Sequence, residues 1–156
     1  MIRALPWLLG FALWMGAAEK PPVLLRVHLQ APEGARGLVT VPVTLLNPPE
    51  TIAIHSMPEV SEKEVERVVQ ESDGTIRVEF DSFGKTKLEA ATSSGRGLIL
   101  VVIVNGRVVY APRIDTVLTR GVLLLPPQAA TAEELQALND QRNKERAQKL
   151  KDVSRS

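Results

Sequence analysis

The sequence predicts an α+β domain, with a mainly antiparallel sheet and helices packed on one face of it. Three observations support this fold class. An apolar run at residues 98–104 turns back through an Asn-Gly pair, residues 75–81 alternate between apolar and charged side chains, and Ser61 and Thr131 each begin a helix-capping pattern. Strands and helices that follow one another in this order favour an antiparallel sheet with helices on one side.

The clearest local signal is a β-hairpin over residues 98–110. Residues 98–104 are rich in β-branched side chains, which favour a strand. Asn105 and Gly106 suit a type I′ turn, which needs a positive φ at both central positions. Pro112 ends the returning strand because it has no backbone N–H. Asn105, Gly106 and Pro112 are therefore predicted to be structural turn residues.

Helical patterns lie on both sides of the alternating strand. Ser61 and Glu64 fit a capping box, and Val65 and Val68 follow at helical spacing, so the sequence predicts a helix from Ser61. The remaining predicted elements are a helix over residues 82–93, a short strand over residues 122–125 and a helix that begins at Thr131.

Strand-like runs precede Ser61 at residues 23–29, 38–46 and 51–57. The first two are expected to form an added N-terminal β-ribbon within residues 23–50, whose place in the sheet the pattern does not fix. Pro42 lies inside the second run, which indicates an edge strand or a bulge there.

The N-terminus has the layout of a secretory signal peptide. Arg3 precedes an uncharged apolar stretch, and small residues at 16–18 suit cleavage after Ala18. The protein is therefore expected to be exported, either periplasmic or secreted. The alternative is an uncleaved membrane anchor, although the apolar run is shorter than the roughly 20 residues that span a bilayer.

The predicted division of the chain is a signal peptide at 1–18, a linker at 19–22, the β-ribbon at 23–50, an α+β domain at 51–141 and a polar C-terminal tail at 142–156.

Charge and residue content argue against several classes of function. Removing residues 1–18 removes Arg3 alone among the charges, so Lys plus Arg falls from 19 to 18 while Asp plus Glu stays at 18. A neutral mature chain does not indicate nucleic-acid binding. The absence of cysteine rules out disulfides, thiolate metal sites and cysteine nucleophiles.

Gly84-Lys85-Thr86 resembles the end of a phosphate-binding loop, but Glu79 stands where that motif needs a glycine, so neither a nucleotide nor another cofactor is expected.

Residues 52–138 resemble the head subdomain in the first periplasmic region of SecD, a protein-export subunit. The hairpin loosely matches the family pattern Leu-Ala-Ile-Val-Leu-Asp-Gly-Lys-Val, with Asn105 in place of the family's Asp. Residues 111–114 match Ala-Pro-x-Ile, and residues 131–138 match Thr-x-Glu-Glu-Ala-x-x-Leu. The resemblance implies a SecD-head-like fold. It does not imply translocase activity, because the transmembrane helices that do the proton-coupled work of SecD have no counterpart after residue 18.

The resemblance and the missing catalytic motifs favour a non-enzymatic binding module of the cell envelope. The SecD head is thought to touch polypeptides that emerge from the translocon, so polypeptides or envelope proteins are the expected partners. Strand addition at an exposed edge is the expected mode, and the candidate edge is the segment 113–118 together with residues 122–125. The predicted binding residues lie between Pro112 and Pro126, and they are Arg113, Ile114, Val117, Val122 and Leu124. The same prolines also suit plain protection of an edge.

Two other functions are consistent with the sequence. The first is a small exported hydrolase or metal-dependent enzyme that uses His28 and His55, the only two histidines, together with a carboxylate such as Glu59. The second is a structural domain without a ligand.

Overall fold

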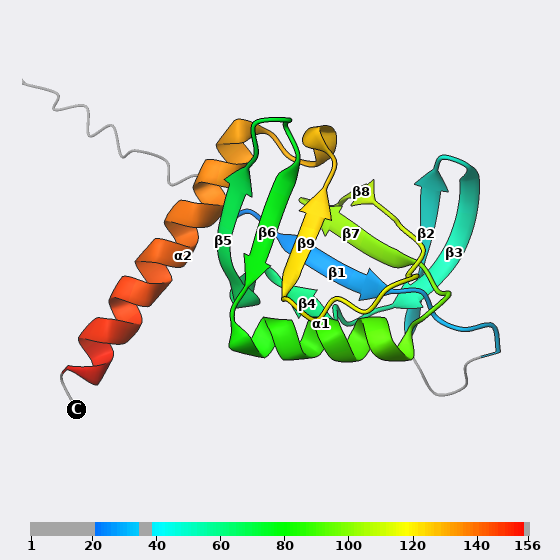
Figure 1. The fold of residues 1–156 in the computed structure, drawn as a ribbon, viewed down its shortest axis with the longest axis horizontal. Coiled ribbons are helices and arrows are strands. Elements are labelled where there is room, and N and C mark those ends of the chain that lie inside the picture. The colour runs from blue at the N-terminus through cyan, green and yellow to red at the C-terminus, as the bar shows by residue number, and fades with distance from the viewer. Residues whose placement is uncertain (1–20, 35–38, 155–156) are drawn as a thin grey trace, which may run out of the picture.

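The computed structural model describes residues 21–34 and 39–154, in which two sheets pack face to face beside a two-stranded ribbon (Figure 1). One sheet has the strand order β4-β1-β7-β8 and the other the order β5-β6-β9, while β2 and β3 form the ribbon. The strands are β1 (Leu25–Leu29), β2 (Thr40–Leu46), β3 (Pro49–His55), β4 (Val60–Ser61), β5 (Val65–Gln70), β6 (Ile76–Phe80), β7 (Leu100–Val104), β8 (Arg107–Tyr110) and β9 (Val122–Leu125). The helices are α1 (Ser82–Ser94) and α2 (Ala132–Val153), with short 3₁₀ turns η1 (Glu62–Glu64) and η2 (Pro127–Ala129). The predicted α+β class with antiparallel strands is confirmed.

The main core fills the space between the two sheets. Val27 and Val102 come from the first sheet, Val78 and Leu123 from the second, and all four are buried. Leu88 of α1 joins this cluster, as do Leu135 and Leu138 of α2. Figure 1 shows α1 lying along the ends of both sheets and α2 running beside β5 before it extends away from the body. Burial of these aliphatic side chains is the main favourable contribution to folding.

The N-terminal strand lies inside the first sheet. β1 pairs with β4 on one side and with β7 on the other, so Val27 is opposite both Val60 and Val102. The β2–β3 ribbon packs on the outer face of this sheet, where Leu45, Ile52 and Ile54 form a second apolar cluster with Ile99 and Val101 of the β7 side. The predicted β-ribbon of residues 23–50 therefore has other bounds in the structure. β1 belongs to the four-stranded sheet, and the ribbon consists of β2 and β3 and ends at His55.

The predicted hairpin is confirmed. β7 and β8 pair through a turn in which Asn105 has a φ of 48° and Gly106 a φ of 78°. Positive φ at both central positions defines the type I′ turn, and these residue types tolerate it.

The helix predicted from Ser61 is wrong. The capping box of Ser61 and Glu64 is present, but it caps the three-residue turn η1, and Val65 then begins strand β5. A β-bulge between Val65 and Arg67 explains the misleading spacing, because it brings Val65 and Val68 onto the same buried face although they are three residues apart. Valine-rich segments also favour strands over helices.

The C-terminal segment differs from expectation, whereas Gly84 lies near the start of a helix as expected. α2 continues to Val153, and Arg142, the first residue of the predicted polar tail, is only 5% exposed. Gly84 lies in the first turn of α1, where there is no room for a side chain: a Cβ there would lie 2.7 Å from Cβ of Glu64 and 2.9 Å from Cβ of Phe80. Close packing therefore explains the glycine of the Gly84-Lys85-Thr86 segment.

Candidate functional site

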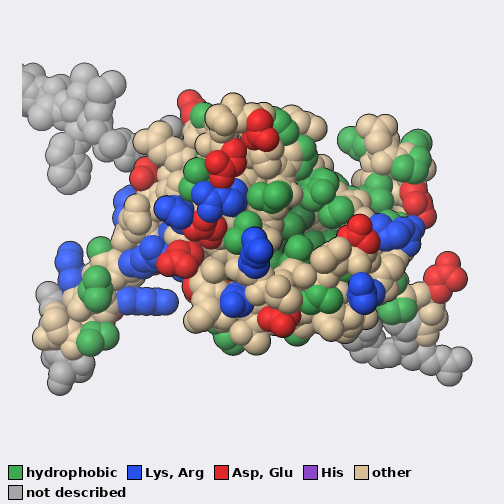
Figure 2. Space-filling view, viewed as in Figure 1, with side chains coloured by type: hydrophobic (Ala, Val, Ile, Leu, Met, Phe, Trp, Pro, Cys, Tyr) green, Lys and Arg blue, Asp and Glu red, His purple; other side chains and the backbone are tan. Residues whose placement is uncertain are grey.

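A groove of about 540 Å³ opens between β9, the end of β8 and the loop that joins them. All five predicted binding residues line it, namely Arg113, Ile114, Val117, Val122 and Leu124. Leu124 is 54% exposed, whereas Ile114 is buried in the floor. Figure 2 shows apolar side chains gathered on this face, between β9 and the β7–β8 hairpin.

Hydrogen bonds hold the loop that borders the groove in place. The N–H of Ile114 donates to the carbonyl of Leu98 (2.8 Å), and the N–H of Leu100 donates to the carbonyl of Pro112 (2.9 Å). Further along, the N–H of Leu118 donates to Oγ1 of Thr92 in α1 (3.0 Å). The loop wall is therefore fixed at both ends before any partner binds.

The structure corrects one detail of the predicted edge. Residues 113–118 do not form a strand, because Ile114 already pairs with Leu98 and the carbonyl of Val117 accepts the N–H of Thr119 in a turn (3.1 Å). These residues form the wall of the groove, and β9 alone supplies its edge strand. Leu118, the last residue of the predicted segment, is partly buried and lines the same groove, as does Tyr110, which sequence reasoning missed.

β9 presents unpaired backbone groups to the groove. It lies at the end of the order β5-β6-β9, and in residues 21–34 and 39–154 it pairs with β6 alone. The N–H of Phe80 donates to the carbonyl of Gly121 (2.9 Å), and Val78 lies opposite Leu123. Because hydrogen-bonded and non-hydrogen-bonded pairs alternate in an antiparallel ladder, the N–H and C=O groups of Val122 and Leu124 point away from β6.

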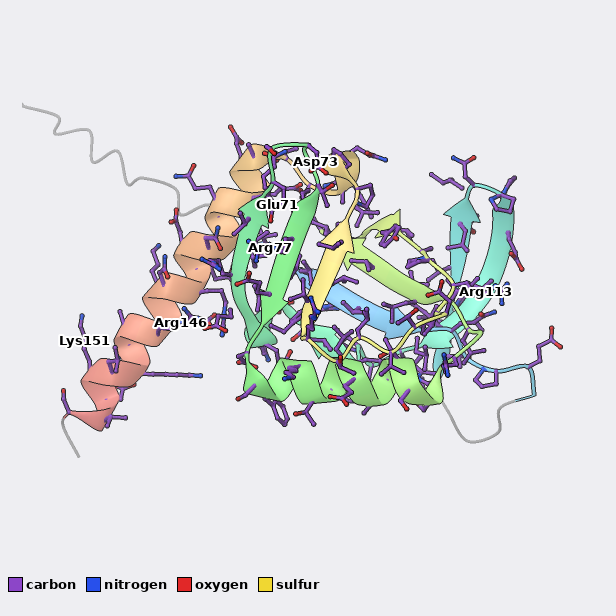
Figure 3. All side chains as sticks on the ribbon, viewed as in Figure 1. Glu71, Asp73, Arg77, Arg113, Arg146 and Lys151 are labelled. Carbon is purple, nitrogen blue, oxygen red and sulfur yellow. The ribbon has the colours of Figure 1, made fainter. Side chains whose placement is uncertain are left out.

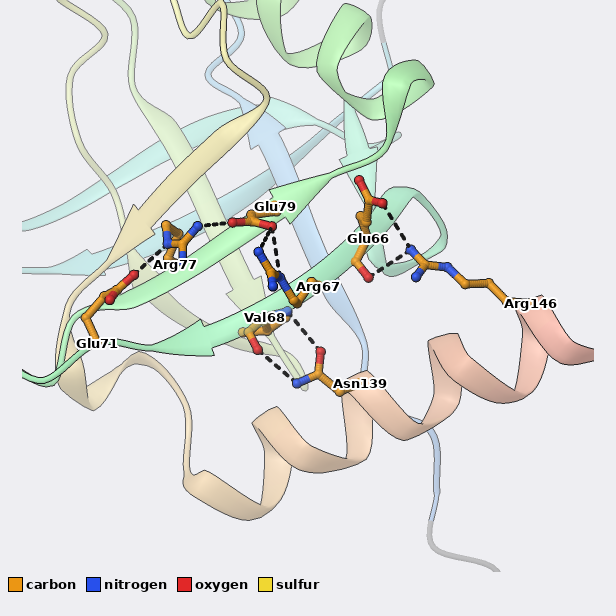
Figure 4. Close-up of polar contacts among 8 residues, drawn as sticks. All are labelled: Glu66, Arg67, Val68, Glu71, Arg77, Glu79, Asn139 and Arg146. Carbon is orange, nitrogen blue, oxygen red and sulfur yellow. Dashed lines mark hydrogen bonds and ion pairs between the residues drawn. The ribbon is translucent and has the colours of Figure 1, made fainter.

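The opposite edge of the same sheet is closed. Asn139 of α2 accepts the N–H of Val68 (2.9 Å) and donates to its carbonyl (2.9 Å), which satisfies the outward backbone groups of β5 at that residue (Figure 4). Arg146 donates to the carbonyl of Glu66 (2.9 Å). α2 thus occupies the edge to which another strand would otherwise pair. The edge at β9 has no such cover among the described residues.

Charged side chains cover the outer face of β5 and β6. Arg67 donates to Glu79 (2.9 Å), and Arg77 pairs with both Glu79 and Glu71 (Figure 4). Figure 3 places Glu71 and Arg77 together over these strands, with Arg113 on the other side of β9. Leu124 lies opposite Arg77 on this outer face, whereas Leu123 faces the core. The side chains of β9 are apolar on both faces, and the two faces differ in exposure: Leu123 is buried, whereas Leu124 is 54% exposed.

The two histidines do not line the groove: His28 lies in β1 and His55 is the last residue of β3. Nδ1 of His28 donates to the carbonyl of His55 (2.8 Å), and Nδ1 of His55 lies 2.9 Å from Oε1 of Glu59. Burial lowers the pKa of His28, although the bond to the His55 carbonyl acts in the opposite direction. The alternation of β1 suggests a solvent-facing His28, but the side chain is 5% exposed and bonded to a backbone carbonyl.

Residues 21–34 and 39–154 contain no cluster of three or more His, Asp or Glu side chains that would hold a metal ion. Nothing in this region favours the predicted enzyme alternative at His28 and His55. Within the same residues, no helix has the length and apolar character needed to cross a membrane. The predicted signal peptide at 1–18 lies outside the described residues.

Comparison with known proteins identifies the fold. No protein-family model and no curated protein matches the sequence. The chain is similar in structure to SecDF, described as a membrane component that enhances protein export, with a TM-score of 0.52 and 19% identity over 76% of this chain and 60% of that chain. A SecDF structure in a super-membrane-facing form matches with a TM-score of 0.55 and 20% identity, over 75% of this chain and 18% of that one. The predicted SecD-head-like fold is confirmed. Similarity at this identity shows the fold, and the chain spans only part of the SecDF chains it matches.

Proposed function

We propose that this protein is a non-enzymatic binding module of the cell envelope that captures extended segments of polypeptides or envelope proteins by strand addition at β9. The single observation that carries the proposal is the contrast between the two edges of the β5-β6-β9 sheet. Side chains of α2 close the β5 edge, whereas β9 presents Val122 and Leu124 to a preformed groove. An extended chain that pairs with such an edge gains main-chain hydrogen bonds for affinity and side-chain pockets for specificity.

The similarity to SecDF supports a role linked to protein export. SecDF is described as a component that enhances export, and a captured segment of an exported chain fits a free strand edge. The sequence of residues 1–18 supports placement outside the cytoplasm, with the membrane as a further partner where this segment is retained. Mass spectrometry of the protein from its native host tests this placement. A mature chain is expected to begin at Glu19, whereas an intact Met1 in the membrane fraction would favour the anchored form.

A proline substitution at the edge tests strand addition directly. Leu124→Pro removes an N–H that points away from β6, so the ladder between β9 and β6 is retained while a donor to the partner is lost. The matched control Leu124→Ala shortens the same side chain but keeps the donor. Binding of a fluorescent, carboxymethylated α-lactalbumin, which stays unfolded, is measured by anisotropy with each full-length variant.

The proline variant is expected to bind about fivefold more weakly than the alanine variant, because one lost hydrogen bond is worth roughly 1 kcal/mol. A thermal unfolding scan of each variant establishes that it is folded. Equal binding by a folded Leu124→Pro variant and by Leu124→Ala would show that β9 is not the edge used. Absence of binding by the unmodified protein would overturn the proposed function itself.

A further inference from the structure

We propose that the groove selects segments in which apolar and polar side chains alternate, with the apolar side chains directed inward. This inference rests on the proposed function and adds to it the class of sequence that is bound. It follows from which residues of β9 direct their backbone groups to the free edge, and from the different exposure of the two faces that an added strand would extend.

The alternation of backbone groups along β9, toward β6 or toward the free edge, determines which residues of an added strand face inward. Val122 and Leu124 direct their backbone groups to the free edge, so an added antiparallel strand forms its hydrogen-bonded pairs opposite these two residues. Opposite residues in a sheet direct their side chains to the same face. The partner residue opposite Leu123 therefore extends the inner face, and its two neighbours extend the outer face.

The inner face is apolar and already shaped. Leu123 is 4% exposed on that face, and the groove beside it is lined by Leu100, Tyr110 and Leu118. Tyr110 and Leu118 are only partly buried, so they retain apolar surface that a partner side chain can cover. A charged side chain placed against these apolar side chains loses part of its hydration. An apolar side chain at the inner position is therefore favoured.

The outer face is accessible to water, since Leu124 is 54% exposed there. An added strand lies next to Val122 and Leu124 on this face, and Glu79 and Arg77, which are engaged in ion pairs, lie one strand further away on β6. Polar or charged partner side chains remain hydrated on this face at little cost. A period of two residues, apolar inward and polar outward, is therefore the pattern that matches both faces.

Two peptides of equal composition test this inference on the full-length protein. One alternates Glu-Val four times, so that all valines lie on one face of an extended strand. The other repeats Glu-Glu-Val-Val twice, so that each face carries both residue types. Equal net charge and equal valine content remove differences in long-range electrostatics and in total hydrophobicity. Affinities are measured by isothermal titration calorimetry, with Leu124→Pro and Leu124→Ala as the edge variant and its control.

The alternating peptide is expected to bind at least about tenfold more tightly than the paired peptide, and Leu124→Pro should remove most of that binding. Equal affinities would overturn the pattern inference and leave strand addition standing. Failure of both peptides to bind while unfolded α-lactalbumin still binds would overturn the inference alone. Failure of all three probes would overturn the proposed function as well.

Discussion

Nδ2 of Asn105 lies 2.8 Å from Oε1 of Glu134, so the tip of the β7–β8 hairpin is bonded to the first turn of α2. The same amide accepts the N–H of Leu24 through Oδ1 (3.0 Å). Glu134 also accepts a bond from Arg107 (2.7 Å) and reaches back to the N–H of Thr131 in the helix capping box (2.9 Å). One side chain at the turn therefore links β1, the hairpin and α2.

This arrangement predicts that Asn105→Asp destabilises the protein more than Asn105→Gly. An aspartate cannot donate to Glu134 and would place a second negative charge beside it, whereas glycine loses the bonds without adding repulsion and tolerates the positive φ. The aspartate variant is expected to lose about 2 kcal/mol of unfolding free energy and the glycine variant about 1 kcal/mol. Urea denaturation measures both. An aspartate variant as stable as the unmodified protein would show that the Asn105–Glu134 bond contributes nothing in solution.

The lowered pKa of His28 predicts a dependence of stability on pH. Burial disfavours the charged imidazole in the folded state, while the unfolded chain takes up a proton near the ordinary pKa of about 6.5. The unfolded state therefore binds more protons in the window below pH 6.5, and the free energy of unfolding falls as the pH drops through that window. Above pH 7 the effect is absent.

Replacing His28 with Gln separates the contribution of His28 to the pH dependence of stability from that of the carboxylates. The expected result is a flatter profile of unfolding free energy between about pH 7 and pH 5 for His28→Gln than for the unmodified protein, measured by urea denaturation at each pH. The variant His55→Gln serves as a control, because it keeps His28 in place. Profiles with the same slope for all three proteins would contradict the buried, neutral state of His28.

Closure of the β5 edge by α2 predicts a large effect at Asn139. Asn139→Ala removes both bonds to the backbone of Val68, which is 4% exposed, and is expected to cost about 1–3 kcal/mol. Asn143→Ala, one helical turn further along and exposed, is the matched control and is expected to be nearly neutral. Hydrogen exchange should also become faster at the Val68 amide in Asn139→Ala. Unchanged exchange there would mean that another group covers this edge.

The sequence specified the local elements whose signals are short-range. The Asn105-Gly106 turn, the alternating strand β6 and the capping box of α2 all follow from adjacent residues, and each is present in the structure. The segment after Ser61 was misassigned because a bulge mimics helical spacing on a strand. A bulge depends on the partner strand, so the pattern of one segment cannot reveal it.

Part of the candidate site was predictable because it, too, depends on short-range signals. Proline and glycine around residues 112–127 indicate a break in pairing, and the five predicted residues do lie together around one groove. The role of Asn139 in closing the other edge was not predictable, because the bond joins residues 71 positions apart. Likewise, the central place of β1 depends on its pairing with β7, which no local signal encodes.

The last turns of α2 predict a sharp boundary between structural and dispensable residues. Nε of Arg142 donates to the carbonyl of Val65 (2.6 Å) and Arg146 to that of Glu66, whereas the described residues after Arg146 are exposed. A chain that ends after Arg146 is expected to lose less than about 0.5 kcal/mol of unfolding free energy. A chain that ends after Gln141 is expected to lose about 2–4 kcal/mol, because two arginine bonds to the β5 backbone are removed. Urea denaturation of both truncations measures the difference. Equal stability of the two truncated chains would mean that the bonds of Arg142 and Arg146 to β5 do not stabilise the protein. Residues 142–156 would then be a dispensable tail, as the sequence predicts.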